Sequence, residues 1–137
     1  MAFTGNATCN SFKTALLNGD VDFAVDVFKI ALYTNNATLN AQTTAYTTEG
    51  EAVGFGYTPG GQVITATQGS DNGVSYISFG NVSWSGVITA RGALIYKVGG
   101  SNPAVCVLDF GADRTSSTVF NVSFPPATSD SALIRIS

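Results

Sequence analysis

Short apolar runs that alternate with polar residues and end at turn residues most constrain how this chain folds. Within residues 118–124, Phe120, Val122 and Phe124 are separated by single polar residues. A period of two residues turns one face of a strand toward a core and the other toward solvent. Such runs recur between turns rich in glycine, asparagine and proline, over residues 27–33, 63–67, 74–79, 87–98, 104–110, 118–124 and 132–136. The series predicts an all-β fold: a single antiparallel β-sandwich, either a jelly roll or immunoglobulin-like.

The sequence pattern of residues 1–20 differs from that of the rest of the chain, and it predicts an N-terminal arm with one short helix. Apolar residues three and four positions apart within residues 12–17 share one helical face. Asn10 or Ser11 is expected to cap the start of this helix, and Gly19 to lie just beyond its end. Because so short a helix is unstable alone, we expect it to pack on the domain or on a neighbouring subunit.

The chain has 137 residues and 14.1 kDa, the size of one domain. We therefore expect residues 1–137 to form a single β-sandwich domain, with a core large enough to need no metal or disulfide. Cys9 and Cys106 match no disulfide spacing pattern, and whether they pair stays open. Residues 35–52 form a long polar connection with a weak strand near residues 45–47, and loops of this length are usually functional.

Charged side chains are scarce and histidine is absent. Asp, Glu, Lys and Arg make up 11% of the chain, where a soluble domain has about 25%. Without histidine, no Ser-His-Asp triad or histidine-based acid–base relay can form within the chain. A net charge of −3 with six Lys and Arg argues against nucleic-acid binding. We expect a structural or interaction role, with no enzyme activity, no cofactor and no bound metal.

Several apparent motifs have plainer structural interpretations. Residues 109–111 spell Asp-Phe-Gly, a kinase tripeptide, but nothing else of a kinase is present. Residues 54–61 are rich in glycine, yet they match no phosphate-binding spacing and lead into a strand instead of a helix. Two carboxylate clusters, at residues 20–26 and 49–51, lack the spacing of a calcium loop and are expected to be solvated.

No run of residues is long and apolar enough to predict a membrane span. The longest nearly apolar run, residues 104–108, is far below the roughly 18 residues required. Residues 1–5 have neither the basic nor the apolar region of a signal peptide. We expect the protein to be made and used in a cytoplasm, or assembled there into something larger, without contacting a membrane.

Five apolar residues are candidates for contacts with partners: Phe3, Phe12, Leu16, Tyr57 and Trp84. Trp84 stands between small polar residues, which indicates partial exposure. An exposed Trp84 with Tyr57 or Tyr76 would form a stacking platform for a sugar. In the other interpretation, Trp84 is wedged at the sandwich edge or in a subunit contact.

Two segments give the chain a family resemblance: Phe28-Lys29-Ile30-Ala31-Leu32-Tyr33-Thr34 and Thr89-Ala90-Arg91-Gly92-Ala93-Leu94-Ile95-Tyr96. The chain resembles small virion structural proteins of tailed bacteriophages, including phages of cyanobacteria and other marine bacteria. The resemblance covers nearly the whole chain, and its further segments are residues 9–13, 43–46, 56–61 and 108–111. It implies a component of an assembled particle without enzymatic activity, and it assigns a function to no single residue.

From this resemblance and the low charge we expect a capsid cement or decoration protein located in the virion. It would bind the major capsid protein, form a symmetric homo-oligomer such as a trimer, and stabilise the shell. Scarce charge suits such a role because charged residues are depleted at interface cores. Two alternatives stay open: a structural protein of the phage tail or neck, and a carbohydrate-binding β-sandwich module.

Overall fold

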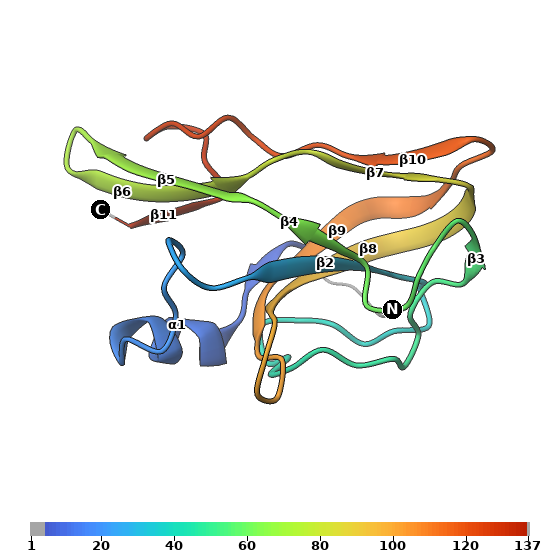
Figure 1. Ribbon diagram of the computed structural model, residues 1–137, viewed down its shortest axis with the longest axis horizontal. Coiled ribbons are helices and arrows are strands. Elements are labelled where there is room, and N and C mark those ends of the chain that lie inside the picture. Colours follow the sequence, from blue (N-terminus) through green and yellow to red (C-terminus); the bar gives the residue numbers. More distant parts are fainter. Residues whose placement is uncertain (1–4, 137) are drawn as a thin grey trace.

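Antiparallel strands lie in two facing layers in the computed structural model, which describes residues 5–136 (Figure 1). Strands dominate and only one short helix is present among these residues, so the predicted all-β, sandwich-like fold is confirmed. The buried residues of both layers belong to one continuous apolar cluster.

The first layer is a sheet with the strand order β1-β9-β8-β2-β4. Its members are β1 (Ala7–Thr8), β9 (Ala104–Thr115), β8 (Val87–Lys97), β2 (Phe28–Tyr33) and β4 (Gln62–Ile64), and β3 (Gly54–Phe55) pairs with the start of β8. The inner strand β2 is almost wholly buried, because strands flank it on both sides and both of its faces are covered. Tyr33, the last residue of this strand, is fully buried as well.

The second layer consists of two separate ladders, which Figure 1 shows end to end above the first sheet. One ladder has the order β11-β6-β5 and the other pairs β10 with β7. Their bounds are β11 (Ile134–Ile136), β6 (Val74–Phe79), β5 (Ala66–Asp71), β10 (Val119–Val122) and β7 (Val82–Ser85). Asn72 and Gly73, both with positive φ, form the turn between β5 and β6, one of the asparagine- and glycine-containing turns expected between the strands.

The chain crosses between the two layers at two sharp corners. Thr65 alone separates β4 in the first layer from β5 in the second. Gly86 alone separates β7 in the second layer from β8 in the first. The predicted strand over residues 63–67 is therefore wrong as one element, since its two halves lie in different sheets.

Three further strand predictions differ from the structure. Residues 82–85 form β7, where no strand was expected. The strand predicted to end at residue 110 continues to Thr115, because β9 shifts its register against β8: Asp109 pairs with Gly92, and Arg114 with Ala90. Gly111, with φ +84°, falls within this irregular stretch of β9. The last strand is shorter than expected and begins at Ile134.

Helix α1 (Asn10–Leu17) confirms the short N-terminal helix. Its N-cap is Cys9 and no side chain caps it, so the expectation of a cap at Asn10 or Ser11 was wrong. At the other end Gly19 has φ +79°, as expected, and its N–H donates to the carbonyl of Leu16. The helix packs on its own domain through Phe12, which is buried.

The two cysteines lie close together and are unpaired. Thr8 is opposite Cys106 in the β1–β9 ladder, which places Cys9 beside that strand. Burial raises the pKa of the Cys9 thiol to about 11 and also raises that of Cys106. Neither thiol is therefore poised to react near neutral pH.

Across residues 5–136, none of the helical structure is both long enough and apolar enough to cross a membrane.

Candidate functional site

The structure places four of the five predicted contact residues, and their environments differ. Tyr57 and Trp84 are buried in the core, so predicting them as surface contacts was wrong. Phe12 is also buried, but it lines a hollow described below. Leu16 is half-buried at the rim of a groove described below. Phe3 lies outside the described residues.

Trp84 is only 2% exposed, which contradicts the expected partial exposure. Its ring packs near Tyr57 at 6.0 Å and near Phe120 at 6.4 Å between centroids. Val82 and Trp84 point into the core while Ser83 and Ser85 face out, an ordinary strand alternation. Because both Trp84 and Tyr57 are hidden, the sugar-stacking platform built on them does not exist.

The carboxylate of Glu51 is the centre of a network of tyrosines. Its Oε1 accepts a hydrogen bond from the Tyr46 hydroxyl at 2.6 Å, and its Oε2 accepts one from the Tyr57 hydroxyl at 2.5 Å. The backbone N–H of Gly60 also donates to Oε2 at 2.8 Å. The Tyr57 oxygen in turn accepts a bond from the N–H of Leu32 on β2.

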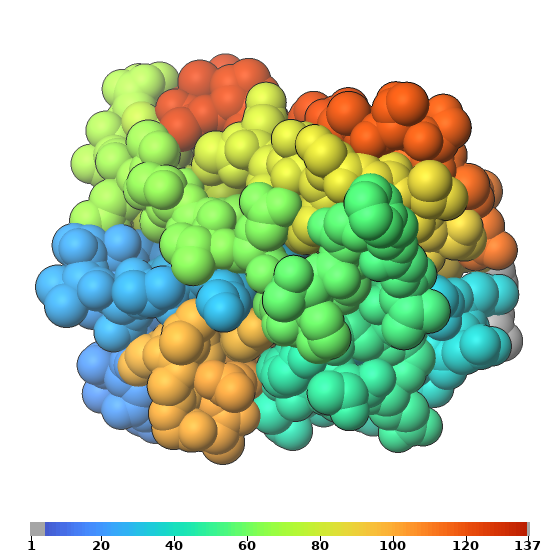
Figure 2. Space-filling view, turned by 45° about the vertical axis from the view of Figure 1, so that its right-hand side comes forward, coloured from blue at the N-terminus to red at the C-terminus, as the bar shows by residue number. Residues whose placement is uncertain are grey.

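Two more tyrosines secure the same stretch of chain. The Tyr96 hydroxyl donates to the carbonyl of Gly60 at 2.6 Å, and the ring of Tyr96 stacks on Tyr46 with centroids 4.8 Å apart. The Tyr33 hydroxyl donates to the carbonyl of Thr47 at 2.6 Å. This network holds the long connection between β2 and β4 against the first layer. Figure 2 shows that connection, from cyan through turquoise to green, over one side of the molecule.

The network is built for holding the chain in place and not for proton transfer. Burial, with Glu51 nearby, raises the pKa of Tyr33, Tyr46, Tyr57 and Tyr96, so these hydroxyls stay protonated and donate. Both oxygens of Glu51 already accept such bonds. The other carboxylate of this cluster, Glu49, is exposed and takes no part.

The carboxylates of residues 20–26 form a small turn instead of a ligand site. Asp22 accepts from the N–H of Ala24, and Asp26 accepts from the N–H of Asp22. Lys97 closes the turn with a 3.4 Å contact to Asp26 and a hydrogen bond to the carbonyl of Asp20. Between Gly5 and Ile136 no three carboxylate or thiol side chains gather closely enough to hold a metal ion.

An apolar surface is displayed at the end of the sandwich where β3 meets the start of β8. Phe55 is 82% exposed and lies opposite Val87, which is also exposed. Val53 precedes the same strand, and Val119 begins β10 next to the corner at Gly86, whose N–H donates to the carbonyl of Thr118. We call these four residues, Val53, Phe55, Val87 and Val119, the apolar end.

Glycines hold Phe55 in this exposed place. A Cβ on Gly56 would lie 2.0 Å from the carbonyl oxygen of Ser85, and one on Gly86 would lie 1.8 Å from that of Phe55. Both distances are far below any tolerated contact, so the two backbones approach this closely only because side chains are missing. The tight contact leaves the Phe55 side chain outside the core. The glycine-rich pattern of residues 54–61 contains no signal that predicts this surface.

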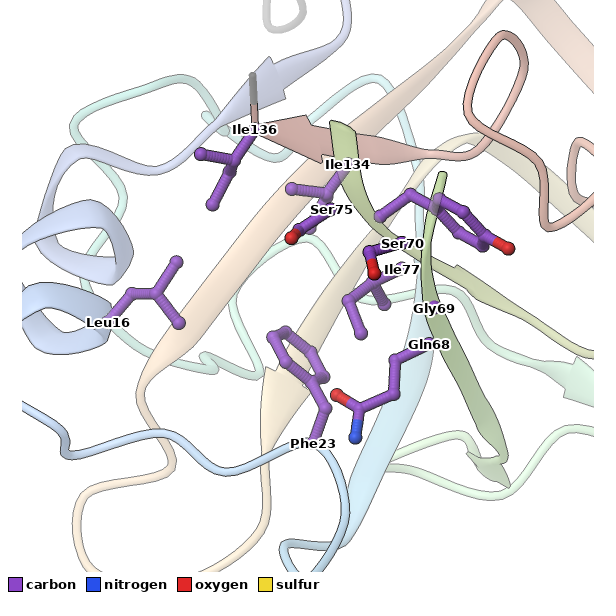
Figure 3. A pocket seen from close by; sticks show the side chains of 10 residues that line it. Leu16, Phe23, Gln68, Gly69, Ser70, Ser75, Ile77, Ile134 and Ile136 are labelled. Carbon is purple, nitrogen blue, oxygen red and sulfur yellow. The ribbon is translucent and has the colours of Figure 1, made fainter. Parts of the chain in front are cut away.

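A second feature is an apolar groove of about 490 Å³ between α1 and the inner face of the β11-β6-β5 ladder (Figure 3). Leu16 and Phe23 form one wall, and Ile77, Ile134 and Ile136 form the other. In Figure 3 these side chains point toward one another across open space. The two layers are therefore not closed on each other at this end.

Comparisons with models of known families, with curated proteins and with solved structures found no match to this chain.

Proposed function

We propose that this protein is a non-enzymatic structural protein of a tailed-phage virion, and most specifically a capsid decoration protein. It would bind the major capsid protein as a symmetric trimer and stabilise the shell. The observation that carries the proposal is the apolar end, where paired glycines keep an aromatic side chain in solvent. An exposed apolar cluster of this kind is typical of a contact surface for another protein.

Two further observations support an assembly role. The charged side chains are few, and several of them are used internally, as in the Arg91–Asp109 pair at 3.0 Å and the Lys97–Asp26 pair. The surface around the apolar end can therefore be covered by a partner at a small desolvation cost. The tyrosine network around Glu51 fixes the long connection that leads into β3, so Phe55 is held on a rigid support.

The proposal predicts that Phe55→Ser strongly reduces incorporation into particles without weakening the fold. Phe55 is 82% exposed, so its removal exposes no core and changes the free energy of unfolding by less than about 0.5 kcal/mol. Removing an anchor of an interface costs about 2 kcal/mol or more of binding. Particles that lack the protein are incubated with each purified variant, and the bound copies are counted by mass spectrometry.

Val63→Ser is the matched control, because Val63 is also exposed but lies on β4, away from the apolar end. It should bind as the unaltered protein does, and bound protein should raise the survival of particles on heating. Equal incorporation of Phe55→Ser would contradict the proposal.

The second candidate is a tail or neck protein, and the same apolar end favours it equally. The number of copies in a particle separates the two locations. Hundreds of copies correspond to a position on the capsid, and about 6 to 18 to symmetric rings in the tail or neck.

A further inference from the structure

Two edge strands face each other across an extension of the groove. β1 is the last strand of the first layer, and β11 is the last strand of its ladder in the second layer. Beyond the part drawn in Figure 3, the groove continues into hollows of about 690 Å³ and 150 Å³. Both hollows are lined by Thr8 of β1 and by Ile134 of β11, so they occupy the gap between the two edges. We call this gap the edge slot.

The register of β1 shows that Thr8 turns its backbone polar groups toward the edge slot. In an antiparallel ladder, residues alternate between those that bond to the partner strand and those whose N–H and C=O point the other way. The N–H of Cys9 donates to the carbonyl of Val105 at 3.0 Å, so Cys9 bonds toward β9. Thr8, opposite Cys106, therefore directs its N–H and C=O away from β9.

Arg135 on β11 also turns its backbone polar groups away from its partner strand. The N–H of Gly80 donates to the carbonyl of Thr65, so Gly80 bonds toward the strand β5. Because bonded residues alternate along a strand, residues 78, 76 and 74 of β6 also bond to β5. The alternate residues of β6, Ser75 and Ile77, thus bond to Ile136 and Ile134. Arg135 is left with its N–H and C=O directed away from β6, toward the free edge.

The side chains of the edge slot combine an apolar floor with positive charge. Phe12, Leu16 and Leu133 contribute apolar surface. Among residues 5–136, the charged side chains that line the slot are Lys13 and Arg135, both exposed, and no side-chain carboxylate lines it. This sign is opposite to the net charge of the chain, −3.

We propose that the edge slot binds an extended acidic segment of a partner protein as an added β-strand between β1 and β11. The backbone of the segment would bond to Thr8 on one side and to Arg135 on the other, as in strand addition at a sheet edge. Its alternate apolar side chains would lie on Phe12 and Leu16, and its carboxylates would meet Lys13 and Arg135. The inference is independent of the proposed function, because it uses a surface distinct from the apolar end.

The test is a titration of the isotope-labelled protein with the peptide acetyl-Val-Thr-Ile-Glu-Val-Glu-amide, followed by amide resonances in NMR. The amides of Thr8 and Arg135 are expected to shift most. A peptide with lysine in place of both glutamates should bind about tenfold more weakly, because two attractions become repulsions. A peptide methylated at the nitrogen of its central isoleucine should lose binding, since added strands need backbone donors.

Charge reversal in the protein keeps the test independent of any one peptide. Lys13→Glu with Arg135→Glu should bind the lysine peptide better than the glutamate peptide, whereas Lys29→Glu, on β2, should behave as the unaltered protein does. Absence of binding at millimolar peptide, equal binding of both peptides, or shifts confined to other amides would overturn the proposal. Shifts of Thr8 and Arg135 on concentrating the protein alone would also overturn it, because a second copy would then fill the slot.

Discussion

Tyr57 illustrates how much a single side chain does in this protein. Its ring packs near Trp84 in the core, and its hydroxyl donates to Glu51 while accepting from the N–H of Leu32. Tyr57 thus joins strand β2, the long connection between β2 and β4, and the apolar core. Tyr76, by contrast, is half-buried on β6, beside Gly69 and apart from this network.

Tyr57→Phe should lower the free energy of unfolding by about 1 to 3 kcal/mol. The phenyl ring keeps the packing, but the change leaves the buried N–H of Leu32 without its acceptor and removes a donor from Glu51. Tyr76→Phe is the control and should change the stability by less than about 0.5 kcal/mol. Urea unfolding measures the free energy of unfolding of both variants. Equal stabilities of Tyr57→Phe and Tyr76→Phe would contradict the role given to the tyrosine network.

Among the elements, the junction between β3 and the β7–β8 corner depends most on backbone contact. Gly86 joins two strands of different layers, and its Cα faces the backbone of Phe55 and Gly56. A side chain at residue 86 would push β3 away from β8. The arrangement of the apolar end therefore depends on this glycine.

Gly86→Ala should destabilise the fold by about 1 to 3 kcal/mol, because the new methyl group would overlap the carbonyl oxygen of Phe55. Gly80→Ala is a matched control: nothing lies within 4 Å of a Cβ there, and no positive φ is required. The midpoint of thermal unfolding should fall for the first variant and stay level for the second. A level midpoint for Gly86→Ala would mean that β3 can shift freely.

Strands with clear alternation could be predicted, and strands that change sheets could not. The spacing of Phe120 and Val122 identified β10, and the Asn72-Gly73 turn was found from its residue types. Residues 82–85 have the same alternation, but the small polar neighbours of Trp84 suggested exposure instead. The corner at Thr65 has no local signal, because it depends on which sheet each half of the run joins.

At the scale of the molecule, the two surfaces offered to partners arise from contacts between distant residues. Phe55 is exposed because its strand meets Gly86, and the edge slot exists because β1 and β11 end different sheets. Neither follows from local sequence pattern. Of the predicted contact residues in the described part of the chain, Leu16 and Phe12 line one of these surfaces, and Tyr57 and Trp84 line neither.

The whole molecule should lose stability in alkali. Burial raises the pKa of Tyr33 and Tyr57, so above the ordinary tyrosine pKa of about 10 the unfolded chain ionises while the folded chain keeps its protons. Their stabilising effect is complete below that pH and declines above it. Above about pH 10, each of these two tyrosines should lower the free energy of unfolding by about 1.4 kcal/mol per pH unit.

Urea unfolding at a series of pH values, with tyrosinate absorbance recorded alongside, measures this decline. The Tyr57→Phe variant should show a shallower slope, because one titrating group is gone. Tyrosines that all ionise near pH 10 in the folded protein would contradict the expected shift.

The corners at Thr65 and Gly86 have a mechanical consequence. Each layer is tied to the other by continuous backbone at these two points and through residues 116–118 between β9 and β10, so a force that draws the layers apart is borne partly by covalent bonds. The end with the open groove lies beyond the Thr65 corner, and there only side-chain contacts resist the force. Under tension the sandwich should therefore open from the helix end, while the end that displays Phe55 keeps its shape.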